Sequence, residues 1–212
     1  MSENIVAILP ELWVAIGQTF LMLGIGLSAA IVVGGPLGIV VFLMSPGQSL
    51  SNRFGFVVLN WVINTVRSFP FIILLVALVP FTRVIAGSSI GPVAAAVPLS
   101  FAAIPYFARL VEQNLRDVPR GVIEAAHAMG ASELQIIWRV LIVEARSGLV
   151  LALTVLAISF LSYSAVAADH AIRYGYYRFQ TDVMVLTVAI LIVLVQAIQL
   201  VGNTIARRLD KR

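Results

Sequence analysis

The stretch EAAHAMGASELQIIWRVLIVE, residues 124–144, is a polar segment between hydrophobic runs long enough to span a membrane. Gly130 suits the left-handed backbone position that follows a helix end. Ser132 and Gln135 have the S-x-x-Q spacing of a capping box, which satisfies free backbone amides where a helix starts. The spacing therefore predicts two short helices joined at a sharp corner, within a polar insert of about residues 117–146.

The helix after this corner has an amphipathic pattern. Leu134, Ile137 and Leu141 recur along one face, while Glu133 and Arg139 lie off it. The pattern predicts that the apolar face is buried against a partner surface. On periodicity alone, an ordinary helical hairpin at the membrane surface is the simpler interpretation, and a docking device is the other.

The composition places the whole chain in a bilayer. With 60% hydrophobic and 11% charged residues among 212, and a mean hydropathy of +1.02, it cannot fold as a water-soluble domain with a polar shell. A spanning helix needs roughly 20 apolar residues. The sequence predicts an all-α, polytopic membrane protein with about five transmembrane helices, in one domain over residues 1–212. The expected spans are residues 17–44, 54–82, 92–108, 147–168 and 183–206.

Basic residues orient the predicted bundle, because short cytoplasmic loops carry an excess of Lys and Arg. The C-terminal tail and the loop between the third and fourth spans are therefore expected in the cytoplasm. Counting back through the spans places the N-terminus, with Glu3 and Glu11 but no Lys or Arg, on the periplasmic side. No cleavable signal peptide is apparent, so the first span is expected to stay as an anchor. The basic residues behind this count are Arg109, Arg116, Arg120, Arg139, Arg146, Arg207, Arg208, Lys211 and Arg212.

Residue types exclude several kinds of chemistry. The chain has no cysteine, which rules out thiolate metal sites. Its only lysine is Lys211, so it lacks the P-loop that binds nucleotide phosphates, and it is expected not to be an enzyme. His127 and His170 are expected on opposite sides of the membrane and cannot share a metal or a catalytic triad. The net charge of +4 indicates membrane topology and not nucleic-acid binding.

Arg67 and Pro70 interrupt the second hydrophobic run. A charge or a proline is costly in lipid unless it faces a cavity or the membrane edge. In one interpretation Arg67 reaches the cytoplasmic interface and Pro70 begins the deep part of the helix. In the other, the break lines a translocation path. Arg67 is the only ionisable side chain within the expected spans, which disfavours a proton-coupled carrier.

Two further patterns have open interpretations. Hydroxyl side chains near the outer end of the fourth span either satisfy helix carbonyls or form a polar gate for a zwitterionic solute. Gly34 and Gly38 have the G-x-x-x-G spacing, which fits a dimer face or a contact within one chain. The hydroxyl residues are Ser159, Ser162, Tyr163 and Ser164.

The order of residues in the corner resembles the EAA loop of ABC-transporter permeases, the importer subunits served by an external binding protein. Glu124, Ala125 and Ala126 are followed by three residues, Gly130 and nine more residues before the run 140–143. Residues 66–83, 104–112, 118–130 and 172–179 extend the similarity. Nearly the full chain therefore resembles the permease of a methionine-type ABC importer.

This resemblance implies a subunit of the bacterial inner membrane, surrounded by lipid, that pairs with a second copy of itself. It would bind two cytoplasmic ATP-binding subunits and a periplasmic substrate-binding protein. ATP and Mg²⁺ would belong to the ATP-binding subunits, and this chain would carry no cofactor. It would move an amino acid, methionine, inward by alternating access. A permease for another small solute and a structural membrane subunit without transport are the alternatives. The coupling corner would consist of Glu124, Ala125, Ala126, Gly130 and Ser132.

The chain departs from the family pattern in two places. The usual ending I-x-L-P reads VLIV at residues 140–143, so without a proline the second helix is expected to run on through Glu144. After Ala165 the family tends to carry a longer glycine-rich run, whereas this chain has only residues 166–170. The second departure bears on which solute would pass the outer gate.

Overall fold

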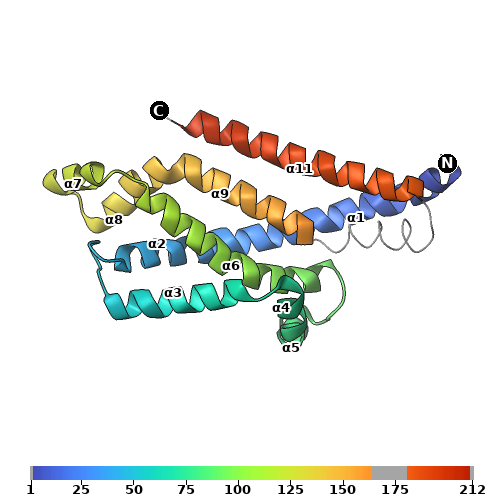
Figure 1. The fold of residues 1–212 in the computed structure, drawn as a ribbon, viewed down its shortest axis with the longest axis horizontal. Coiled ribbons are helices and arrows are strands. Elements are labelled where there is room, and N and C mark those ends of the chain that lie inside the picture. Colours follow the sequence, from blue (N-terminus) through green and yellow to red (C-terminus); the bar gives the residue numbers. More distant parts are fainter. Residues whose placement is uncertain (1, 164–180, 211–212) are drawn as a thin grey trace.

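The computed structural model describes residues 2–163 and 181–210, and every regular element among them is helical. The chain begins with one long helical rod made of α1 (Ser2–Ala29), a π-helical turn η1 (Ala30–Gly34) and α2 (Gly35–Met44). Next come α3 (Arg53–Ser68), α4 (Phe71–Ala77), α5 (Val79–Ala86) and the long helix α6 (Pro92–Arg116). The polar insert forms α7 (Arg120–Ala128), α8 (Glu133–Gln135) and a second π-helical turn η2 (Ile136–Leu141). The last elements are α9 (Ile142–Tyr163) and α11 (Thr181–Leu209), as Figure 1 shows.

The helices have the lengths that an all-α membrane protein requires. Four helical segments are long and apolar enough to cross a bilayer, and a fifth crossing results if the bent pair α3 and α4 is one span. The expected fold with about five spans is therefore confirmed. The four segments are Pro10–Met44, Pro92–Arg116, Glu133–Tyr163 and Met184–Leu209.

The insert and the two termini define the ends of the bundle. In Figure 1, α7 and α8 lie at the same end as the C-terminus, and α1 begins at the other end. We call the first the corner end and the second the opposite end. The sequence predicts this relation, because an odd number of spans separates the termini and the insert shares the side of the C-terminal tail.

α6 is the central helix of the bundle and packs against α1, α2, α3 and α9 (Figure 1). Its inner face is fully buried. Because lipid tails are as apolar as leucine, close packing and not transfer from water holds such helices together. The buried residues of this face include Leu99, Ala103, Phe107, Val111 and Leu115.

Gly34 and Gly38 let the first helical rod approach α6 at backbone distance. A Cβ atom built on Gly34 would lie 2.6 Å from the carbonyl oxygen of Ile104. A Cβ atom on Gly38 would lie 2.5 Å from the carbonyl oxygen of Ala108. Both glycines are buried within the chain. The G-x-x-x-G spacing thus serves a contact inside one chain, and the dimer-face interpretation is wrong for these two residues.

The second hydrophobic run is not the single straight helix over residues 54–82 that its hydropathy suggests. α3 ends at Ser68, and α4 leaves it at an angle of 100°. Pro70 has no N–H to continue the helical hydrogen bonds, and a residue before proline is pushed to extended backbone, which is observed at Phe69 with φ −73° and ψ 129°. The sequence predicts the break, but not its angle.

Other helix ends also differ from the expected spans. The first rod starts ahead of residue 17, and α6 continues beyond residue 108 to Arg116, since no glycine or proline follows Pro105 in that helix. α11 continues to Leu209, where side chains of α9 satisfy its end: Arg146 Nε donates to the Leu209 carbonyl at 2.8 Å, and Ser147 Oγ to the Ala206 carbonyl at 3.1 Å. An arginine at a helix C-terminus also complements the helix dipole.

Candidate functional site

The turn between α7 and α8 is fixed by backbone hydrogen bonds around Gly130. The N–H of Gly130 donates to the His127 carbonyl at 2.9 Å, and the N–H of Ala131 donates to the Ala126 carbonyl at 3.1 Å. This pair of bonds is the Schellman pattern, which requires left-handed backbone at the residue after the helix end. Gly130 has φ +79°, as its position in the sequence predicts.

The start of α8 is fixed by side chains. The N–H of Ser132 donates to Oε1 of Gln135 at 2.9 Å, and the N–H of Gln135 donates to Oγ of Ser132 at 3.4 Å. The predicted capping box is therefore confirmed. With the turn at Gly130, it fixes the direction in which the chain leaves α7.

The buried face of the helix after the corner differs from the predicted one. Ile136 and Leu141 are the buried residues, whereas Leu134 is 65% exposed. The cause is η2, because a π-helical turn takes an extra residue and moves the side chains off the 3.6-residue period. The expectation that Leu134 shares a buried face with Leu141 is wrong, and the helix runs on through Glu144 as predicted.

Exposed apolar side chains surround the corner instead. Met129 is 82% exposed and Trp138 is 61% exposed, close in sequence to the exposed Leu134. We call Met129, Leu134 and Trp138 the corner patch. Exposed Met and Trp are typical of interaction surfaces. Glu124 and Ala125 of α7 are also exposed, while Ala126 is buried against the core.

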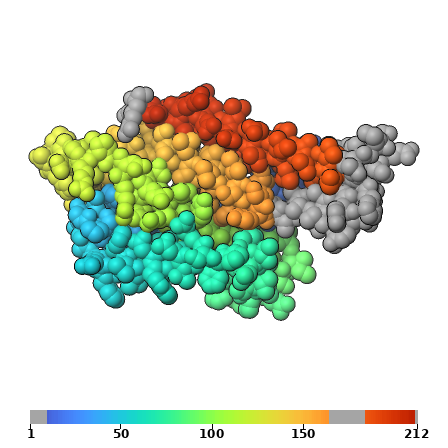
Figure 2. Space-filling view, in the orientation of Figure 1, coloured from blue at the N-terminus to red at the C-terminus, as the bar shows by residue number. Residues whose placement is uncertain are grey.

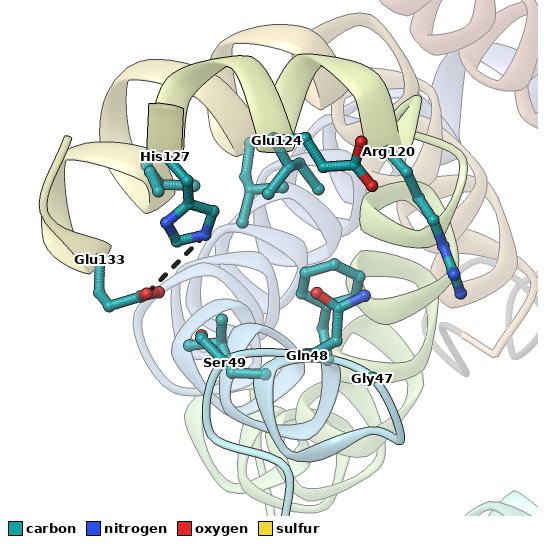
Figure 3. A pocket seen from close by; sticks show the side chains of 12 residues that line it. Gly47, Gln48, Ser49, Arg120, Glu124, His127 and Glu133 are labelled. Atoms are coloured by element: carbon teal, nitrogen blue, oxygen red, sulfur yellow. Dashed lines mark ion pairs between the residues drawn. The ribbon is translucent and has the colours of Figure 1, made fainter. Parts of the chain in front are cut away.

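A cavity of about 410 Å³ lies behind α7, between that helix and the loop that joins α2 to α3. Figure 3 shows His127 and Glu133 pointing toward one another across it, with Nε2 of His127 and Oε1 of Glu133 3.9 Å apart. Arg120 and Glu124 line it from α7, and the loop residues Gly47, Gln48 and Ser49 close it from below. The cavity gives polar groups of the corner access to solvent or to a bound partner.

A buried ion network ties α6 to α3 below the corner. Glu112 is 1% exposed, and its two carboxylate oxygens lie 2.5 Å from Arg109 Nη1 and 2.7 Å from Arg116 Nη2. Arg109 Nη1 also donates to Oδ1 of Asn60 at 3.0 Å, and Arg116 lies over the ring of Phe56. The second oxygen, Oε1, has the ion pair but no aligned hydrogen bond. The sequence interpretation missed this network because it ended the third span at residue 108, although the R-x-x-E-x-x-x-R spacing contains the signal.

Three of the residues predicted for a translocation path meet in one pocket. Arg67, Ser159 and Tyr163 line a cavity of about 140 Å³ between α3, α4, α6 and α9. The guanidinium of Arg67 lies 5.3 Å from the centre of the Tyr106 ring. We call this cavity the Arg67 pocket.

Arg67 lies away from the corner along α3. α3 begins at Arg53 near the corner end and runs toward the opposite end (Figure 1). At a rise of 1.5 Å per residue, Arg67 is about 20 Å along this helix from Arg53. Arg67 is therefore set apart from the corner along α3, and the interpretation in which it reaches the cytoplasmic interface stays a prediction.

The other residues predicted for the path contribute less to the Arg67 pocket. Pro70 caps α4 beside the pocket but does not line it. The hydroxyls of Ser159 and Ser162 donate to the carbonyls of Val155 and Ile158, at 2.9 and 3.2 Å. Such bonds to the preceding helical turn agree with the interpretation in which these hydroxyls satisfy helix carbonyls, the simpler alternative to a polar gate. Ser164 and residues 166–170 lie outside the described residues.

Comparison with known proteins gives consistent results. Residues 23–212 match the family described as "Binding-protein-dependent transport system inner membrane component". The probable D-methionine transport system permease protein MetI of Vibrio cholerae is 42% identical over 203 residues, covering 92% of this chain and 90% of the relative. The D-methionine transport system permease protein MetI of Escherichia coli K12 is 43% identical over 167 residues, covering 78% and 75%.

Solved structures extend the comparison to three dimensions. A chain in the structure described as inward facing conformations of the MetNI methionine ABC transporter matches with a TM-score of 0.90 and 39% identity, over 100% of both chains. A chain of an amino acid ABC transporter crystallised with histidines matches with a TM-score of 0.69 and 20% identity, over 96% and 97%. The second match is a likeness of fold alone.

Proposed function

Because this chain belongs to the family of binding-protein-dependent transport system inner membrane components, we propose that it is the membrane-spanning permease of an ATP-driven methionine importer. The observation that supports the substrate is the match, over the whole chain, to a chain of a solved methionine ABC transporter. The importer would move methionine inward across the bacterial inner membrane. The N-terminus would lie in the periplasm and the C-terminus in the cytoplasm.

The corner supports the division of labour in such an importer. Lys211 is the only lysine, so the chain has no P-loop of its own, and hydrolysis of ATP with Mg²⁺ belongs to a cytoplasmic ATPase. The corner patch, beside the exposed Glu124 and Ala125, is the surface on which we place that ATPase. Two permease copies, two ATPases and a periplasmic binding protein make up the assembly.

The positions of the corner and the Arg67 pocket, at the two ends of one helical segment, support transport by alternating access. The corner lies at one end of α8, η2 and α9, and Ser159 and Tyr163 of the Arg67 pocket lie at the other end. Closure of two ATPases would displace both corners and rearrange the packed helices around the path between the permease copies. Interfaces between packed helices change between discrete arrangements, which is suited to gating.

Reconstitution tests this function directly. The permease, its cognate ATPase and the binding protein are placed in proteoliposomes with labelled methionine. We expect accumulation of methionine that requires both ATP and the binding protein. Accumulation of a different solute, or a binding protein that does not bind methionine, contradicts the substrate. An assembled complex that hydrolyses ATP but accumulates no solute supports a structural subunit without transport.

Replacing Gly130 with valine should weaken binding of the ATPase by about tenfold or more, because left-handed backbone costs an ordinary residue roughly 1–2 kcal/mol and is worst for β-branched side chains. No atom lies within 4 Å of a Cβ built at Gly130, so the effect comes from the backbone and not from a clash. Co-purification and titration of the ATPase against the solubilised permease measure it.

Gly130→Asn is the matched control, since asparagine is larger than glycine but tolerates the left-handed region. It should bind the ATPase nearly as wild type does. If Gly130→Val binds as tightly as Gly130→Asn, the geometry of the corner is not what the ATPase requires.

A further inference from the structure

We propose that the Arg67 pocket binds the transported amino acid on its way through the membrane, with the guanidinium of Arg67 holding the carboxylate. The proposal rests on the function proposed above and adds to it a binding site within the permease itself. Three observations support it: the contacts that Arg67 makes, the residue types that line the pocket, and the position of the pocket at the break between α3 and α4.

Arg67, which is exposed in the single chain, differs in its contacts from three other arginines of the bundle. Arg109 and Arg116 pair with Glu112, and Arg146 bonds a carbonyl at the end of α11. Among the described residues, no carboxylate pairs with Arg67, whose charged group contacts the face of Tyr106. A charge within a membrane span, where the sequence places Arg67, is costly unless it meets a partner. The free edge of this guanidinium presents the planar donors that match a carboxylate with two parallel hydrogen bonds.

The part of the pocket wall that α9 contributes suits the ammonium group of the same solute. The hydroxyl hydrogen of Ser159 is used in the bond to the Val155 carbonyl, so its oxygen lone pairs remain as acceptors. The ring of Tyr163 stacks on Phe71 with centroids 5.0 Å apart, which holds an aromatic face at the pocket. A hydroxyl oxygen and an aromatic face both attract a cation.

The remaining walls are apolar and suit a thioether side chain. The apolar lining residues include Phe71, Leu74 and Phe160. Sulfur makes favourable contacts with aromatic rings at about 5 Å. The cavity of about 140 Å³ has the size of a small organic solute, since an apolar cavity of about 150 Å³ accepts benzene.

The pocket also lies where a membrane protein can expose backbone. Val66, Arg67, Phe69 and Phe71 line it from both sides of the break between α3 and α4. Interrupted helices are tolerated at membrane depth only where they are buried in protein or line a cavity, and transporters place their substrates at such breaks. The break, and an arginine with no carboxylate partner in the described part of the chain, therefore point independently to the same site.

A binding experiment on the permease–ATPase complex tests the proposal, and the binding protein is left out so that its selectivity does not contribute. Calorimetry measures the Kd of methionine and of methionine amide, which lacks the carboxylate charge, for wild type and Arg67→Gln. We expect Arg67→Gln to weaken methionine binding about tenfold to a hundredfold, the usual range for a hydrogen bond to a charged group. Methionine amide should bind both proteins with nearly equal Kd, because either change removes the same interaction.

Two further variants sharpen the measurement. Arg83→Gln makes the same chemical change on α5, outside the pocket, and should leave the Kd of methionine unchanged. Arg67→Lys keeps the charge but loses the planar pair of donors, so its Kd should fall between wild type and Arg67→Gln. Size-exclusion chromatography shows whether each complex is assembled.

The outcomes separate this proposal from the function on which it rests. If methionine binds wild type and Arg67→Gln equally, Arg67 serves another group, such as a lipid phosphate, and the proposal is overturned. The same conclusion follows if replacing methionine by its amide raises the Kd by the same factor in wild type and in Arg67→Gln. It also follows if methionine shows no saturable binding to wild type. When proteoliposomes nevertheless accumulate methionine, the transport function stands without this site. If they accumulate none, both fail.

Discussion

Replacing Glu112 with glutamine should lower the free energy of unfolding by about 1–3 kcal/mol, because it weakens two charge-assisted contacts but leaves arginines whose side chains are 28% and 46% exposed. The change keeps the shape of the side chain but leaves Arg109 and Arg116 without the carboxylate that lies within 2.7 Å of both. The bond between Arg109 and Asn60, which connects α6 to α3, depends on the same orientation. The shift of the thermal unfolding midpoint of the purified protein measures the effect.

Glu133→Gln is the matched control for this change. Glu133 is 50% exposed and its only described ion pair, with His127, spans 3.9 Å. Exposed pairs contribute about 0–1 kcal/mol, so the midpoint should hardly move. Equal shifts for the two variants would mean that the buried network does not hold α6 in place. Replacing Arg109, Glu112 and Arg116 together by leucine should cost far less than Glu112→Gln, because it leaves no charge unpaired.

Replacing Gly38 with alanine should prevent α2 from packing on α6 and remove most of the folded protein. The added Cβ would lie 2.5 Å from the Ala108 carbonyl oxygen and 2.7 Å from the Val111 Cβ. Overpacking ordinarily costs about 1–3 kcal/mol, and a clash with backbone that cannot rotate away lies at or above the top of that range. The yield of monodisperse protein and its unfolding midpoint measure the loss.

Gly24→Ala, on the same helical rod, provides the control. A Cβ at Gly24 has no atom within 4 Å, and alanine is a better helix former than glycine by about 1 kcal/mol. This variant should be as stable as wild type or slightly more stable. If Gly38→Ala behaves in the same way, the close approach of α2 and α6 is not required.

The parts of the fold that the sequence predicts are those fixed by local chemistry. The left-handed turn at Gly130 and the capping box of Ser132 and Gln135 need only neighbouring residues, and both are present. The buried face after the corner depends instead on η2, whose extra residue leaves Leu134 exposed. Periodicity assumes a regular helix and cannot report a π-turn.

In the candidate site, too, the sequence predicts the local features and not those that depend on packing. Pro70 and Arg67 predict a break in the helix. The 100° angle and the contact of Arg67 with Tyr106 depend instead on how α4 and α6 pack. Ser159 and Tyr163 reach the same pocket from a helix far along the chain. Glu112 lies beyond residue 108, where the expected third span ends, and its two arginine partners make its burial possible.

The helix that begins at the corner continues, through the π-helical turn η2, to the Arg67 pocket. Glu133–Tyr163 is one segment of 31 residues, a length of about 45 Å at the usual rise. The backbone on both sides of η2 keeps helical angles, with φ −67° and ψ −40° at Gln135 and φ −66° and ψ −37° at Ile142. Val143 retains the N–H that a proline would remove. If an ATPase acts on the corner as proposed, a displacement of Glu133 would be carried along this one continuous helix, through η2, to Ser159 and Tyr163 at the Arg67 pocket.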